Sequence, residues 1–212
     1  MRPATHSGVC HSDLAFISNR YQHMPELTRK GQIGGHKGIG SSVKLGEGVT
    51  NVKLGYRVGV KWITSTCLSC DLCMAEFAGR CASRKVPSYR DPGTFQQYMI
   101  SDPKHVTPIP HELDSAEAAP LLCGSFSVYS ALLKSDCKPG DWIGLSGAIG
   151  GLGHLAIKYA EAFGPLVLGI DHGTKKVSDW SLVQLLSSIS LSMVTRVLSL
   201  GSSISQVEAV TL

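Results

Sequence analysis

Short apolar runs alternate with glycine turns between residues 34 and 60, as in the stretch SSVKLGEGVTNVKLGYRVGVKW. Turn residues at such close spacing are typical of a β-rich, barrel-like unit. Further along the chain, the stretch GTFQQYMI at residues 93–100 alternates between apolar and polar positions as a strand does. The pattern therefore predicts mainly β-structure in the first half of the chain.

The pattern becomes helical from Asp114 to Ser135, with Asp114 or Ser115 as a plausible N-cap and Glu117 in the first turn. From Lys138 to Asp171 the chain reads as turn, strand, glycine loop, amphipathic helix, turn and second strand, which is one βαβ unit. Serine and leucine dominate residues 178–205, and no strand, cap or glycine turn of the expected repeating kind is recognisable there. This divergent tail could form one or two apolar helices against the sheet, and the alternative is that its sequence was not selected for this fold.

Composition and charge narrow the class of function. The 212 residues are 43% hydrophobic, which is ample for packed cores, and the 20 basic and 16 acidic residues are scattered rather than grouped into basic blocks. Nucleic acid is therefore a poor candidate partner. No apolar run reaches the roughly 18 residues that span a bilayer and no secretory signal is recognisable, so we expect a cytoplasmic protein without a membrane partner.

Four of the seven cysteines lie within fifteen residues, in a polar segment of about residues 66–84 that reads as a loop. Cys67, Cys70, Cys73 and Cys81 have the spacing C-x2-C-x2-C-x7-C, and a tetrahedral zinc ion would close such a loop without a hydrophobic core beneath it. An iron–sulfur cluster is the main alternative, but its usual pattern continues with three residues and then Cys-Pro, whereas Ala82 follows Cys81. Unligated thiols are the remaining alternative, and structural zinc is the reading we favour.

Three further residues suggest a second metal site. Cys10 stands in SGVCHSDL, His36 stands in GGHKGIG between glycines that let the backbone crowd around the ring, and Cys123 ends an apolar run in PLLCGSF. Taken alone, Cys10 would be read as a buried small residue. Two thiolates and one imidazole from separate parts of the chain would leave the fourth position of a zinc ion open, as in catalytic rather than structural sites.

The glycine loop SGAIGGLG follows a predicted strand and opens a predicted helix, which is the context of a dinucleotide-binding fingerprint. Gly150 would let the backbone approach a pyrophosphate and Gly153 would permit close packing of helix on strand. Asp171 ends the second strand about where an acid binds the ribose 2′-hydroxyl, which favours NAD over NADP. The predicted cofactor-binding residues of this unit are Gly150, Gly151, Leu152, Gly153 and Asp171.

These motifs, in this order, resemble the zinc-containing alcohol dehydrogenases of the medium-chain dehydrogenase/reductase superfamily, most closely the yeast and fungal branch. The resemblance covers Ser7 to about Asp171. It implies an α/β fold with a β-rich GroES-like catalytic domain at residues 1–124, an incomplete Rossmann-type NAD-binding unit at residues 125–177, and a tail at residues 178–212 of unknown role. In this chain Ala148 stands at the position of the usual first glycine of the fingerprint. The resemblance implies that the yeast-like enzymes share this departure.

The resemblance also implies roles for individual residues. Cys10, His36 and Cys123 would bind the catalytic zinc, the four clustered cysteines would bind the structural zinc, and Ser12 would relay the proton of an alcohol while hydride passes to NAD. Asp13 would orient His36, His11 would lie near the cofactor pyrophosphate, and Trp62 would either line the alcohol pocket or belong to the ordinary core. The implied activity interconverts alcohols and aldehydes or ketones, and family members form dimers or tetramers, which leaves a homo-oligomer open.

Four departures from the family pattern weigh against activity. Lys37 follows His36 where the family usually has a glutamate near the zinc, and Ala15 replaces the histidine that ends the proton relay of yeast-like enzymes. The sequence also begins close to the first zinc motif, and the Rossmann pattern ends after one βαβ unit, so we expect a chain truncated at both ends. A non-catalytic zinc-binding remnant or interaction module is therefore the alternative function.

Overall fold

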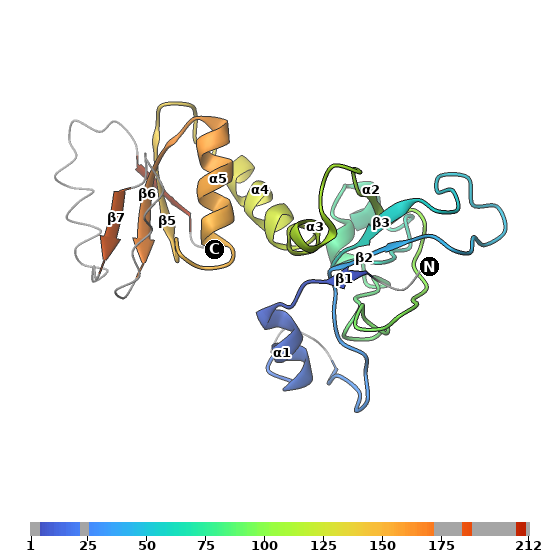
Figure 1. Cartoon of the computed structure of the whole chain (residues 1–212). Coiled ribbons are helices and arrows are strands. Elements are labelled where there is room, and N and C mark those ends of the chain that lie inside the picture. The colour runs from blue at the N-terminus through green and yellow to red at the C-terminus, as the bar shows by residue number, and fades with distance from the viewer. Residues whose placement is uncertain (1–4, 22–25, 172–183, 188–206, 211–212) are drawn as a thin grey trace. The chain divides into compact units, whose positions relative to one another are not determined.

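The computed structural model describes residues 5–21 and 26–171, together with the backbone of residues 184–187 and 207–210. The chain divides into two compact units, residues 1–123 and residues 124–212. Each unit contains a four-stranded sheet (Figure 1). The two units are described separately below.

The sheet of the first unit is antiparallel and has the strand order β1 (His6–Ser7), β2 (Gly38–Ser41), β3 (Arg57–Val60), β4 (Thr107–Pro108). Ile39 of β2 is fully buried against Ala118 and Ala119 of the helix α3 (Ser115–Leu121). Gly59 of β3 leaves room for the Leu122 side chain, which would collide with a Cβ at that position. Small residues on both sides thus let the helix approach the sheet closely, and the β-rich character expected for this part of the chain is confirmed.

The helical segment expected from Asp114 to Ser135 is two helices, not one. Asp114 is the N-cap of α3, with its Oδ1 accepting a 2.7 Å hydrogen bond from the Ala116 backbone N–H, and the helix ends at Leu121. A new helix, α4 (Gly124–Lys134), starts after a break at Leu122 and Cys123. Among the described residues no single helix is long and apolar enough to cross a membrane, although α3 and α4 together meet that criterion by length and composition.

The predicted strand at residues 93–100 is wrong. Only its first residues pair with another segment: the Gly93, Thr94 and Phe95 N–H groups donate to the carbonyls of residues 33–35. Beyond them the backbone is irregular, and Tyr98 and Ile100 are 58% and 98% exposed. The apolar side chains at the alternating positions therefore do not pack against a core within the described chain. Without such packing the segment does not form a strand.

Gly93→Ala should be strongly destabilising. A Cβ at Gly93 would overlap the carbonyl oxygens of Gly34 and Gly35, which are backbone atoms that cannot rotate away. We expect the free energy of unfolding to fall by about 3 kcal/mol or more, in the range of severe backbone and packing defects. Urea denaturation of the variant measures this loss. Gly48→Ala is the control, because Gly48 has φ +74° and no atom within 4 Å of an added Cβ, so that this variant has backbone strain without a steric collision. A loss no larger than that of the control would contradict the prediction.

The predicted βαβ unit is confirmed in the second unit. Strand β5 (Trp142–Ser146) lies parallel to β6 (Leu166–Asp171), and α5 (Gly153–Phe163) is the crossover between them. Fully buried residues of β5, β6, α4 and α5 form its core: Val128, Ile143, Leu145, Ala156, Ile157, Ala160 and Val167. Gly164 ends α5 with φ +100°, a conformation that favours glycine.

Two short strands extend this sheet, one from residues 178–205, where no strand was recognisable in the sequence, and one just after that stretch. Strand β7 (Gln184–Ser187) pairs with β6, and β8 (Val207–Val210) pairs with β5, both in parallel, so the order is β7-β6-β5-β8. The expectation of apolar helices is therefore wrong for these two segments. The rest of the tail predicted at residues 178–212 lies outside the described residues.

Candidate metal centres and cofactor loop

The four clustered cysteines converge in a lobe made of residues 67–81. Their sulfurs all lie within 4.8 Å of one another, with 3.9 Å between Cys67 and Cys73 and 3.6 Å between Cys67 and Cys81. A tetrahedral zinc ion with Zn–S bonds of about 2.3 Å spaces its sulfurs by about 3.8 Å, so the donor set fits such an ion. The helix α2 (Asp71–Met74) and the 3-10 turn η1 (Ala78–Arg80) bury no residue, so a metal would take the place of a core in this lobe.

The lobe cysteines differ in acidity. Backbone N–H groups of Ser69 and Cys70 point at the Cys67 sulfur and lower its pKa to about 6. Desolvation and the neighbouring thiols raise the pKa of Cys73 to about 11. Cys67 is therefore already a thiolate at neutral pH, and thiolate is the form that binds a metal.

A second group of donors comes from three distant segments of the first unit. Cys10 is the N-cap of helix α1 (His11–Ile17), His36 precedes β2, and Cys123 lies in the break after α3. Their ligand atoms also lie within 4.8 Å of one another, and His36 is fully buried. The structure thus brings together the three residues that the sequence suggested as an open zinc site.

Asp13 orients the His36 ring. The two side chains are joined by a 2.8 Å hydrogen bond from His36 Nδ1 to Asp13 Oδ1, and the Cys10 N–H donates to Asp13 Oδ2 over 2.9 Å. Because the carboxylate accepts, the proton of this bond is on Nδ1, and the buried Nε2 has no hydrogen-bond partner in the described part of the chain. A buried imidazole nitrogen without a hydrogen-bond partner, in a group whose ligand atoms lie within 4.8 Å of one another, is what a metal ion requires, so the residues fit zinc.

Burial alone would raise the pKa of Asp13, but the hydrogen bond from His36, the Cys10 N–H and the nearby Lys37 charge outweigh it, so the pKa lies below its usual value. A carboxylate with a lowered pKa stabilises the fold above the pKa of about 3.9 that Asp has in the unfolded chain. That stabilisation is lost as the pH falls through the lower pKa of the folded state.

Lys37 is a buried cation beside this site. The residue is 6% exposed, and Nζ donates one 3.3 Å hydrogen bond to the Val9 carbonyl. Within the described ranges no carboxylate lies within 4.0 Å of it. Burial and the Cys10 thiol raise the pKa of Cys123, while the Lys37 charge acts against that rise. The ammonium is therefore in electrostatic range of a donor sulfur but is poorly paired itself.

Lys37→Met should stabilise the metal-free chain, because it removes a buried and poorly paired charge while keeping the length of the side chain. We expect the free energy of unfolding to rise by about 1 to 3 kcal/mol. Urea denaturation in the presence of a chelator measures the change, and Lys44→Met, at an exposed position, is the matched control. A loss of stability in Lys37→Met would mean that the ammonium is well compensated.

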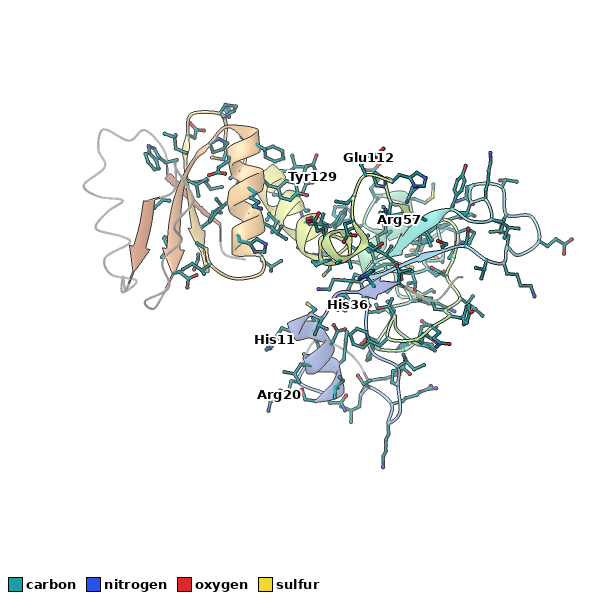
Figure 2. All side chains as sticks on the ribbon, viewed as in Figure 1. His11, Arg20, His36, Arg57, Glu112 and Tyr129 are labelled. Atoms are coloured by element: carbon teal, nitrogen blue, oxygen red, sulfur yellow. The ribbon has the colours of Figure 1, made fainter. Side chains whose placement is uncertain are left out.

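The other predicted residues of the first unit are distributed around this centre. Ser12 is half-buried on the first turn of α1, and His11 is exposed at the start of the same helix (Figure 2). Trp62 packs edge-on against His36, with ring centroids 5.0 Å apart, and stacks on Phe16 at 5.5 Å. Trp62 is therefore part of an aromatic cluster and at the same time a neighbour of the candidate metal ligand.

The glycine loop of the second unit joins β5 to α5. A Cβ at Gly153 would overlap the Gly147 carbonyl oxygen, so the helix starts in close contact with the loop backbone. Asp171 accepts a 2.7 Å hydrogen bond from the Ile149 N–H through Oδ2, which ties the end of β6 to the loop. Gly150, Gly151 and Leu152 are exposed, so their backbone is open to a ligand.

Sequence reasoning missed the polar residues that surround the base of the cysteine lobe, chiefly Thr66, Asp102 and His105. These residues belong to no recognisable motif. Only the turn-forming pair Asp102-Pro103 hinted at an ordered loop there.

Comparison with known proteins agrees with this architecture. The family model described as "Alcohol dehydrogenase GroES-like domain" matches residues 4–111. The chain is 51% identical over 175 residues to "Alcohol dehydrogenase 2" of Emericella nidulans and 43% identical over 171 residues to the alcohol dehydrogenase of Schizosaccharomyces pombe. Each alignment covers 81% of this chain and 48% of the relative, so the chain spans about half the length of the curated relatives it matches.

Solved structures share this fold. A cinnamyl alcohol dehydrogenase from Sorghum bicolor superposes with a TM-score of 0.70 at 31% identity, over 78% of this chain and 48% of that chain. A structure titled as CAD from Helicobacter pylori complexed with NADP(H) has the same fold, with a TM-score of 0.71 at 24% identity over 97% of this chain and 54% of that chain. From the matched domain and these relatives, the chain belongs to the zinc-containing alcohol dehydrogenases of the medium-chain dehydrogenase/reductase superfamily.

Proposed function

We propose that this chain is an NAD-dependent oxidoreductase that binds one catalytic and one structural zinc ion and interconverts alcohols and aldehydes or ketones. The observation that carries the proposal is the buried His36, whose Nδ1 is bonded to Asp13 while its Nε2 faces Cys10 and Cys123. The names of the curated relatives support an alcohol as substrate.

The residues of the site would divide the work of the reaction. When bound, zinc supplies Lewis-acid polarisation of the substrate oxygen, and NAD supplies the hydride acceptor. Asp13 holds the proton on His36 Nδ1, so that Nε2 stays unprotonated. Ser12 would pass the hydroxyl proton of the substrate outward, and because Ala15 cannot accept a proton, solvent would receive it.

The cofactor assignment rests on the second unit. In the glycine loop between β5 and α5, Gly151 and Leu152 are exposed directly before the helix start, where a pyrophosphate is favoured. Asp171 at the end of β6 would accept a hydrogen bond from the ribose 2′-hydroxyl and repel a 2′-phosphate, which favours NAD over NADP. His11 would contribute to the pyrophosphate site as the family resemblance implies.

A second candidate function is a metal-binding chain without turnover. The poorly paired Lys37 next to the open site and the missing histidine at Ala15 favour it. In this alternative the cysteine lobe would be metallated and the site at Cys10, His36 and Cys123 would not support hydride transfer.

One experiment separates the two candidates. The purified full chain is analysed for zinc by mass spectrometry, and NADH is monitored at its absorbance band after addition of NAD and a primary alcohol. Two zinc ions per chain with NADH formation support the dehydrogenase. One zinc ion per chain without turnover supports the non-catalytic alternative, and a dehydrogenase that prefers another alcohol class would give turnover with that class alone.

We further propose a cytoplasmic setting. All seven cysteines fall within the described residues and none of them is in a disulfide, which suits a reducing compartment where clustered cysteines bind metal. Expression in fungal cells with a fluorescent tag tests this location.

A further inference from the structure

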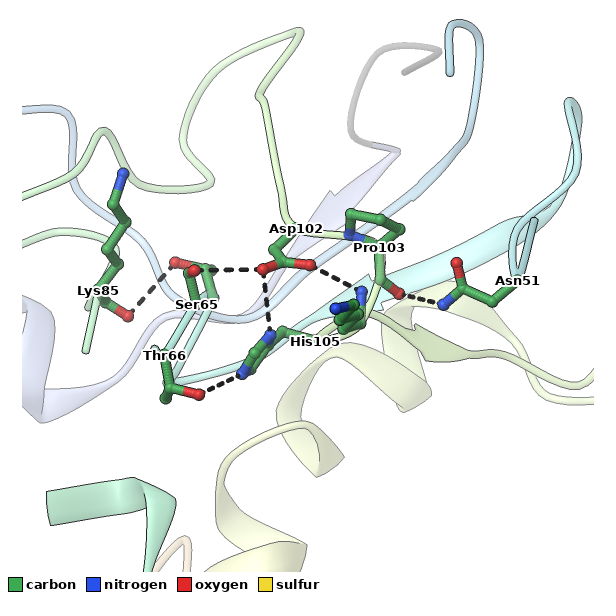
Figure 3. Close-up of polar contacts among 9 residues, drawn as sticks. Asn51, Ser65, Thr66, Lys85, Asp102, Pro103 and His105 are labelled. Atoms are coloured by element: carbon green, nitrogen blue, oxygen red, sulfur yellow. Dashed lines mark hydrogen bonds and ion pairs between the residues drawn. The ribbon is translucent and has the colours of Figure 1, made fainter. Parts of the chain in front are cut away.

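A polar cluster at the base of the cysteine lobe is used by neither metal site. It consists of Ser65 and Thr66, directly before Cys67, and of Asp102 and His105 in a turn from a distant part of the sequence (Figure 3). The cluster lies wholly in the first unit.

Two hydrogen bonds connect the turn to the lobe. Thr66 Oγ1 and His105 Nε2 are 3.2 Å apart, and Ser65 Oγ donates to Asp102 Oδ2 over 3.2 Å. Thr66 is 8% exposed and the His105 side chain is 12% exposed, so the bond between them is shielded from water. A buried side-chain bond of this kind is costly to break, because its polar atoms lose solvent as well as each other.

The turn itself is fixed from its other side. The Asp102 carboxylate accepts the Lys104 N–H at 2.9 Å, the His105 N–H donates to the Asp102 carbonyl at 3.0 Å, and Asn51 Nδ2 donates to the Pro103 carbonyl at 2.8 Å. His105 Nδ1 lies 3.6 Å from Asp102 Oδ2, which keeps the ring beside the carboxylate. The turn is thus a rigid support rather than a loose loop.

The lobe has few other attachments to the rest of the unit. Residues 64–65 and residue 85 form the neck of the lobe, where Ser65 and Lys85 make an antiparallel β-bridge. The Lys85 N–H donates to the Ser65 carbonyl, and the Thr64 N–H donates to the Lys85 carbonyl. Its apolar side chains do not form a core, since Met74 and Phe77 are 73% and 59% exposed. Apart from the sulfur contacts within the lobe itself, support for Cys67 from the rest of the unit therefore acts through the neck.

We propose that Asp102 and His105 form a clamp that holds Ser65 and Thr66, and through them positions Cys67, so that the lobe retains its metal. The clamp is a positioning device and takes no part in chemistry. It rests on the metal-binding part of the proposed function and not on turnover.

The test measures release of zinc from the lobe. The full chain carries Cys123→Ser, so that one complete donor set remains, and a chromogenic chelator reports zinc loss over time. Thr66→Val removes the hydroxyl and keeps the shape of the side chain, and His105→Ala removes its partner. Each is expected to speed release by about five- to tenfold, the equivalent of one hydrogen bond. The double variant should be no faster than the faster single variant, because both changes break the same bond.

Matched controls make the same substitutions outside the clamp, at Thr50→Val and His111→Ala, which are exposed positions of the same unit. Their release rates should equal that of the parent chain. The proposal would be overturned if the clamp variants released zinc at the parent rate. It would also be overturned if the double variant accelerated release by the product of the two single-variant factors. If His105→Ala does not fold, the zinc-release rate of the conservative variant Thr66→Val decides the test, provided that its urea midpoint equals that of the parent chain. Alcohol turnover is assayed separately in the chain that keeps Cys123, and a clamp effect together with no turnover there would leave the clamp standing and reject the dehydrogenase proposal.

Discussion

Cys67→Ser is expected to remove metal from the lobe and to unfold it, whereas Cys123→Ser should leave folding largely intact and abolish any alcohol turnover. The difference follows from what surrounds each sulfur. The lobe at residues 67–81 buries almost no side chain, so its order depends on the metal. Cys123 is held between helices that pack on their own cores, so its sulfur is not needed for folding.

The magnitude of the first effect comes from the free energy of structural zinc sites. A complete set of ligands contributes about 10 to 16 kcal/mol in small zinc-dependent domains, and removal of one thiolate forfeits much of that. Cys67 is the most sensitive choice, because its sulfur lies near those of both Cys73 and Cys81 and has the lowered pKa of about 6. We expect aggregation or proteolysis in the lobe at neutral pH.

Zinc content by mass spectrometry, limited proteolysis and thermal denaturation check this prediction. Cys137→Ser, which changes a half-buried cysteine outside both donor groups, is the matched control and should retain zinc. Equal effects of Cys67→Ser and Cys123→Ser on folding would contradict the division into structural and catalytic sites. Bound iron or visible absorbance in place of zinc would contradict the assignment of the lobe.

The metal donors were predictable from sequence because zinc dictates both residue type and spacing. Cys67, Cys70 and Cys73 lie within one loop, so their convergence needs no knowledge of the fold. Cys10, His36 and Cys123 are far apart in sequence, and the expectation that they meet depended on the family resemblance. The structure brings both groups together, although whether the second group is catalytic stays a prediction.

Features set by tertiary context were harder to predict. The stretch at residues 93–100 has the alternation of a strand, but the pattern does not tell whether a partner strand exists, and Ile100 is left 98% exposed. The break at Leu122 and Cys123 was hidden in a continuous helical pattern. The pairing of β7 with β6 and of β8 with β5 was also not predictable, because a strand of four residues is too short for its alternation of apolar and polar positions to be recognised.

Asp13→Asn is expected to weaken metal binding at the second site by at least 10- to 100-fold while leaving the lobe metallated. The Asp13 carboxylate accepts two hydrogen bonds, from His36 Nδ1 and from the Cys10 N–H, and it is 2% exposed. An amide has one oxygen and one NH₂ group, so it can accept only one of these bonds as they stand. If its NH₂ faces His36, the ring must move its proton to Nε2, the atom that would bind the metal.

Titration of the metal-free chain with Co²⁺ checks this expectation, because thiolate and imidazole coordination produces visible bands that count occupied sites. The parent chain should bind two equivalents and Asp13→Asn one tightly, and ¹⁵N chemical shifts of His36 should report the proton on Nε2. Asp136→Asn, at an exposed position of the second unit, is the matched control and should bind two. Retention of two tight sites in Asp13→Asn would contradict this expectation and would mean that packing, including the edge-on contact with Trp62 at 5.0 Å, is enough to orient the ring.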